Sequence, residues 1–133
     1  MTELIPNLLS ETSGYLANNT PDFHTLYSIW SGADNLLGGG KFGPQSAADA
    51  VAAVKTAIED LEAAGVRHLL IFNMPRMGDT PDAQSDGPLS IAAANIFADA
   101  YNADLTIALA ELRADPCSSP GFTMSIFTRS WCW

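Results

Sequence analysis

The sequence predicts an α/β fold in which short buried strands alternate with helices around a parallel sheet. Three observations predict this fold: short apolar runs rich in strand-forming residues, helical patterns between those runs, and loops rich in Gly, Asn or Pro after them. The three predicted strands are Leu26–Trp30, His68–Phe72 and Thr123–Phe127. We find no internal repeat and no linker, so we expect residues 1–133 to belong to a single domain.

The helices are predicted from apolar residues that recur every three or four positions and so share one face. The three predicted helices span residues 4–16, 47–64 and 89–112. Ser46 stands three residues before Asp49, an arrangement similar to a capping box, and Gly65 is a typical residue for a helix end. Residues 76–88 are rich in Pro, Gly and Asp, so we expect a loop there.

The first predicted strand is unusual for its place in the chain. Leu26–Trp30 is almost continuously apolar, which is typical of a parallel strand with neighbours on both sides. It is nevertheless the first of only three strands, and a three-stranded sheet has two open edges. We therefore interpret the chain as the later part of a larger sheet, with an exposed edge at Leu26–Trp30.

Composition excludes several classes of function. Six Lys and Arg against fifteen Asp and Glu give a net charge of −9, which disfavours binding to nucleic acids. No apolar run approaches the length of about 18 residues that a transmembrane helix needs. The N-terminal residues lack the basic and apolar regions of a signal peptide, so no export signal is expected and no localisation is assigned. Cys117 and Cys132 are too few for a disulfide framework, and whether they pair is left open.

Ligand sites in open α/β sheets lie beyond the carboxyl ends of the strands, so residues 31–44 and 73–88 are the candidate loops. The most distinctive segment is Trp30–Leu36, where small residues allow backbone amides to approach a ligand and Asn or Asp side chains can bond to it. An alternative interpretation is a Gly-rich turn with an Asx motif.

Other motifs are weaker. Residues 38–41, Gly-Gly-Gly-Lys, lack the first Gly and the Ser or Thr of a phosphate-binding loop. No Gly-x-Ser-x-Gly elbow is present, and the two histidines lie away from the candidate loops. Three loop aspartates lack the spacing of a calcium-binding loop and are interpreted as solvated: Asp79, Asp82 and Asp86. We therefore expect no metal and no cofactor.

Residues 26–35, Leu-Tyr-Ser-Ile-Trp-Ser-Gly-Ala-Asp-Asn, resemble the third conserved block of GDSL (SGNH) esterases and lipases, which reads Gly-x-Asn-Asp at the end of a strand. The resemblance continues through residues 47–75 and through Met-Gly-Asp-Thr-Pro at 77–81, and it extends from about Leu8 to Phe127. It also includes the helix that contains Asn95, Phe97 and Tyr101-Asn102. The resemblance implies a three-layer, flavodoxin-like (SGNH-type) parallel sheet, of which this chain supplies about three strands with their flanking helices.

The resemblance also implies a candidate oxyanion-hole loop made of Gly32, Asp34 and Asn35. An ungapped match places Gly32 on the family Gly, Asp34 on the Asn and Asn35 on the Asp. The family Asn donates a hydrogen bond, whereas an ionised Asp34 can only accept one. Asn35 takes the donor's place only if the turn shifts by one residue.

The family's nucleophilic Ser lies in a Gly-Asp-Ser block and its base in an Asp-x-x-His block, and neither occurs in these 133 residues. The resemblance therefore implies a hydrolase of acyl esters that is truncated and catalytically incomplete as this chain, with no catalytic residue assigned. The alternative is a non-catalytic interaction module that pairs with another chain through Leu26–Trp30. A third interpretation is that the chain has no independent function.

Overall fold

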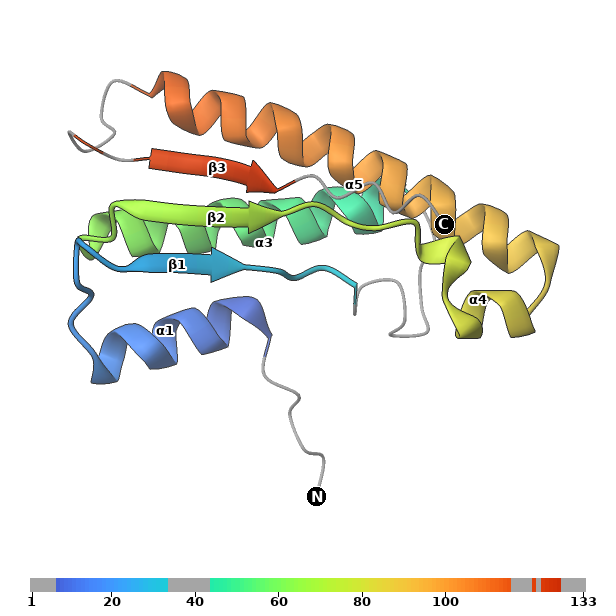
Figure 1. Cartoon of the computed structure of the whole chain (residues 1–133), viewed down its shortest axis with the longest axis horizontal. Helices are drawn as coiled ribbons and strands as arrows, with labels where there is room; N and C mark the ends of the chain where they lie inside the picture. The colour runs from blue at the N-terminus through green and yellow to red at the C-terminus, as the bar shows by residue number, and fades with distance from the viewer. Residues whose placement is uncertain (1–6, 34–43, 116–120, 122, 128–133) are drawn as a thin grey trace.

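The computed structural model describes residues 7–33, 44–115, 121 and 123–127, and the structural statements below concern these residues (Figure 1). The helices and strands are α1 (Leu8–Asn18), β1 (Leu26–Ile29), α3 (Pro44–Ala63), β2 (His68–Phe72), the 3-10 helix η1 (Met77–Asp79), α4 (Pro81–Ser85), α5 (Pro88–Ala114) and β3 (Thr123–Phe127). The predicted α/β alternation is confirmed.

The three strands form one parallel sheet in the order β1-β2-β3. In the register, Leu26 lies opposite His68, and His68 lies opposite Thr123. β1 is therefore an edge strand of the described sheet, as its place in the sequence predicted. Because the strands are parallel, the segments that follow β1 and β2 leave the sheet at the same end.

The long helices lie together on one face of the sheet. α3 packs against α5 and also contacts α1. The strand residues that point toward these helices are buried: Ile29, Leu69, Ile71 and Met124. In Figure 1, α3 lies behind the strands and no helix crosses in front of them. The described residues thus form two layers, and the third layer of the expected architecture is not among them.

The core lies between the sheet and the paired helices α3 and α5. Large side chains there are fully buried, including Ile58 of α3 and Phe97 and Leu109 of α5. Burying a side chain of this size contributes about 1.5–3 kcal/mol. The Lys55–Glu111 ion pair at 2.9 Å also joins the two helices, but its exposure limits its contribution to stability.

The structure corrects the predicted loop at residues 76–88, which contains η1 and α4. The Thr80 hydroxyl accepts a hydrogen bond from the Ala83 amide at 3.4 Å, and Pro81 occupies the first turn of α4. A capping hydroxyl and a proline in the first turn both favour helix initiation. The density of Pro, Gly and Asp was therefore a sign of a helix start rather than of an irregular loop.

Smaller differences concern the element ends. β1 ends at Ile29 instead of Trp30, and α3 begins at Pro44 instead of Ala47. α1 begins after Asn7, where the Ser10 amide donates to Asn7 Oδ1 at 2.9 Å and the Asn7 amide donates to Ser10 Oγ at 3.0 Å. This reciprocal capping box fixes the helix start. Within the described ranges, no helix is both long enough and apolar enough to span a membrane.

Candidate functional site

The candidate site begins at Gly32, directly beyond β1. Gly32 has a φ of 108°, a region that L side chains rarely adopt. A Cβ atom added there would lie 2.7 Å from Tyr101 Cε2 and 3.3 Å from Met74 Cε. Both the backbone conformation and the surrounding side chains therefore require glycine at this position.

Tyr101 of α5 holds Ser31, the residue before Gly32, in place. Its hydroxyl donates a hydrogen bond to the Ser31 carbonyl oxygen at 2.9 Å, and its side chain is almost fully buried. Burial raises the pKa of Tyr101 to about 12, because the phenolate would lose its hydration. The hydroxyl consequently keeps its proton, and its role as donor, at neutral and mildly alkaline pH.

The loop after β2 is held by Asn102, which follows Tyr101 in α5. The Met74 amide donates to Asn102 Oδ1 at 2.7 Å, and Asn102 Nδ2 donates to the Met74 carbonyl oxygen at 2.9 Å. Met74 is buried, so both of its backbone groups depend on this one side chain. Neighbouring residues of α5 thus fix the segments that follow β1 and β2.

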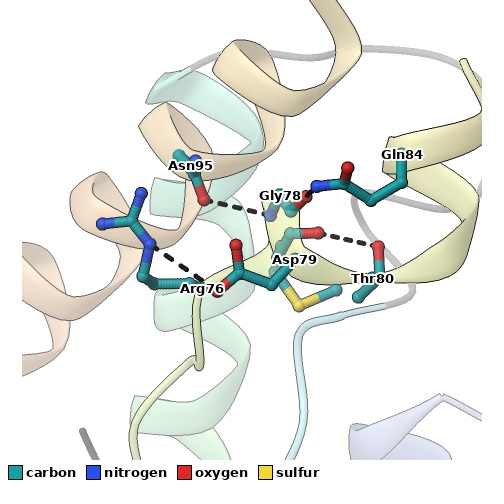
Figure 2. Close-up of polar contacts among 7 residues, drawn as sticks. Arg76, Gly78, Asp79, Thr80, Gln84 and Asn95 are labelled. Atoms are coloured by element: carbon teal, nitrogen blue, oxygen red, sulfur yellow. Dashed lines mark hydrogen bonds and ion pairs between the residues drawn. The ribbon is translucent and has the colours of Figure 1, made fainter. Parts of the chain in front are cut away.

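A third contact from α5 supports the turn at η1, and Figure 2 shows the polar side chains that converge on it. The Gly78 amide donates to Asn95 Oδ1 at 3.0 Å, and Gln84 Nε2 donates to the Gly78 carbonyl oxygen at 2.7 Å. A Cβ on Gly78 would lie 2.6 Å from Asn95 Nδ2. The turn is therefore closely packed against α5. The Arg76–Asp79 pair beside it, at 3.8 Å, is exposed and adds little.

The structure tests only part of the predicted oxyanion loop. It places Gly32 at the carboxyl end of the sheet, in contact with Tyr101 and Met74. Asp34 and Asn35 lie outside the described residues, as do Cys117 and Cys132. The register that assigns a donor to Asp34 or Asn35 stays a prediction. In the described part of the site, Tyr101 and Met74 fill the space beside Gly32 that a side chain would need, and the Tyr101 hydroxyl holds the peptide that precedes Gly32.

Other candidate groups do not join this turn. His68 is the first residue of β2 and so lies at the opposite end of the sheet from Gly32. No group of three or more His, Cys, Asp or Glu able to hold a metal ion occurs in the part of the chain that the structure describes. In that same part, every buried side-chain nitrogen and oxygen has a hydrogen-bond partner.

Sequence reasoning assigned no role to the three α5 side chains that organise this end of the sheet. Asn95 and Asn102 are seven positions apart, which places them on the same face of the helix. Tyr101 adjoins Asn102 on the buried side of α5. Polar residues that recur within an apolar helical stripe are a usable signal, because buried polar groups need partners.

Comparisons with known proteins assign no family. No family model matches the sequence. Among curated proteins, the chain is similar to one from Pseudomonas putida described as an uncharacterized protein in the trpE-trpG intergenic region, with 33% identity over 76 residues. The match covers 56% of this chain but 13% of the length of that relative. A segment similar to this chain therefore occurs within a much longer protein.

Proposed function

We propose that this chain is part of a GDSL (SGNH)-type ester hydrolase domain with a flavodoxin-like sheet, and that it supplies an oxyanion-hole loop at Gly32. The substrate class is acyl esters. The observation that carries the proposal is the Gly32 turn, where backbone conformation and packing both require glycine at the end of a parallel strand. The resemblance of residues 26–35 to the family's third block places that block's glycine at the same position.

The proposed loop departs from the family pattern in a way that affects its chemistry. Ester hydrolysis needs hydrogen-bond donors where negative charge develops on the substrate oxygen, and losing one donor costs about 2.7–4 kcal/mol of transition-state stabilisation. Asp34 stands where the family has Asn, and an ionised carboxylate would repel that charge. Asn35 supplies a donor if the turn is shifted by one residue.

The remaining machinery is proposed to lie outside these 133 residues. Acyl transfer requires a nucleophile and a base that takes its proton, and the Gly-Asp-Ser and Asp-x-x-His blocks do not occur in this sequence. The Pseudomonas relative supports this view, because the matching segment is a small share of a longer polypeptide. We expect the chain alone to hydrolyse esters at the background rate.

The test compares the 133-residue chain with the reading frame extended in both directions. We measure hydrolysis of p-nitrophenyl acetate and map the serine labelled by a fluorophosphonate. The extended protein is expected to be active and labelled at a Gly-Asp-Ser serine outside this chain, and the double swap Asp34→Asn with Asn35→Asp should raise its turnover. A labelled serine within the 133 residues, or an extended frame without the two blocks, would refute the proposal. Unchanged turnover in the double swap would refute the register.

A second candidate is a non-catalytic interaction module. Leu26 is 61% exposed and Trp30 is 70% exposed, although both are large apolar residues. In the described sheet, β1 pairs with β2 alone, so its other edge offers backbone groups to an additional strand. Strand addition at such an edge is a common mode of peptide and protein recognition.

A further inference from the structure

We propose that Tyr101 is a positioning residue that turns the Gly32 amide N–H to the side away from the Tyr101 hydroxyl, where this N–H serves as a donor to the substrate oxygen. This inference rests on the proposed function for its catalytic consequence, whereas its structural part stands on the contacts of Tyr101 alone. Tyr101 touches no substrate in this proposal and acts through the Ser31–Gly32 peptide.

The peptide between Ser31 and Gly32 links the carbonyl that Tyr101 holds to the Gly32 N–H. The Ser31 carbonyl and the Gly32 N–H belong to the same planar peptide, and no cis peptide bond occurs in the described residues. In a trans peptide these two groups point in opposite directions. Because the Tyr101 hydroxyl holds the Ser31 carbonyl at 2.9 Å, it also turns the Gly32 N–H to the side away from that hydroxyl.

The Tyr101 ring limits where the turn can move. Tyr101 Cε2 occupies the space that a Gly32 side chain would need, and Met74 Cε lies close to the same point. Met74 is held in turn through its backbone by Asn102. The hydroxyl therefore sets the orientation of the peptide, while the ring and Met74 set its position.

The Tyr101 hydroxyl is the donor in its hydrogen bond to Ser31. A carbonyl oxygen only accepts, so the bond requires Tyr101 to stay protonated. The raised pKa of Tyr101 keeps the phenol protonated at neutral and mildly alkaline pH. Replacing Tyr101 by Phe removes this hydrogen bond and keeps the ring against Gly32, so the variant isolates the orienting contact.

The experiment uses the 133-residue chain and its Tyr101→Phe variant, with the Gly32 amide followed by its NMR chemical shift. We expect the Gly32 amide resonance to shift, because the peptide that carries this N–H loses the hydrogen bond at the Ser31 carbonyl. Tyr27→Phe is the matched control, because the Tyr27 hydroxyl accepts from the Asp22 amide at 3.1 Å near the other end of β1. An unchanged Gly32 amide in Tyr101→Phe, or an equal change in Tyr27→Phe, would overturn the proposal.

A second measurement uses the extended, active protein. There Tyr101→Phe is expected to lower kcat with KM unchanged, while Tyr27→Phe changes neither. A purely structural role would instead leave kcat of the folded fraction unchanged, and this result would overturn the catalytic consequence. If the extended protein shows no esterase activity, the proposed function fails, and the Gly32 amide still decides whether Tyr101 orients the turn.

Discussion

Two glycines with nearly the same backbone conformation have different surroundings, and this contrast shows what Gly32 contributes. Gly32 has a φ of 108° and Gly65 a φ of 111°. A Cβ on Gly65 would meet nothing within 4 Å, whereas one on Gly32 would lie 2.7 Å from Tyr101 Cε2. The two positions therefore share backbone strain on substitution, and only Gly32 adds a steric overlap.

We predict that Gly65→Ala lowers the free energy of unfolding by about 1–2 kcal/mol, the usual cost of a left-handed conformation for an L residue. Gly32→Ala should cost at least about 1 kcal/mol more, because the new methyl group forces the buried Tyr101 ring to move. Urea unfolding of both variants beside the parent measures the difference. Equal costs at the two positions would show that the Tyr101 contact does not constrain the turn.

The α5 helix acts as a single element that fixes the carboxyl end of the sheet. Asn95, Tyr101 and Asn102 each bond to the backbone of a different segment: the η1 turn, Ser31 and Met74. The number of bonds differs between the two asparagines. Asn102 makes two hydrogen bonds to Met74, and Asn95 makes one to Gly78.

We predict that Asn102→Ala destabilises the protein more than Asn95→Ala. A buried backbone group left without a partner costs about 1–3 kcal/mol, so losing one partner should cost about 1–3 kcal/mol and losing two about 2–6 kcal/mol. Both substitutions replace Asn by Ala within α5, so the gain in helix propensity is the same in the two variants. Denaturant midpoints of the two variants give the comparison. A smaller loss for Asn102→Ala than for Asn95→Ala would contradict this account of α5.

The strands and long helices could be predicted because their signal is local. The alternation of apolar runs placed β1, β2 and β3 nearly at their observed ends, and the apolar stripe placed α5. The hydrogen bonds from α5 to the segments after the strands were not predictable in the same way. Ser31 and Tyr101, for example, are 70 residues apart in sequence. Such a pairing depends on tertiary structure, and local periodicity carries no information about it.

Within the described residues, the long helices lie on one face of the sheet because of the way the strands are connected. β1–α3–β2 and β2–α5–β3 are crossovers between adjacent parallel strands that proceed in one direction across the sheet. Because such crossovers share the same hand, their helices fall on the same face. The opposite face keeps apolar side chains such as Trp30 and Phe72, whose ring centroids lie 6.0 Å apart. The place of Leu26–Trp30 as the first of three strands predicted the open edge, and the topology explains why no helix of the described residues covers the opposite face.

Our last prediction concerns self-association through this face and edge. The double variant Leu26→Thr with Trp30→Thr should weaken association of the 133-residue chain about tenfold or more, because exposed apolar edges promote pairing between chains. Its free energy of unfolding should change by less than about 1 kcal/mol, since both side chains are largely exposed. Leu89→Thr with Ile107→Thr is the matched control, because it removes exposed apolar side chains from α5. Sedimentation velocity across micromolar concentrations measures association. A parent chain that stays monomeric throughout, or equal weakening in both double variants, would exclude β1 as the pairing surface.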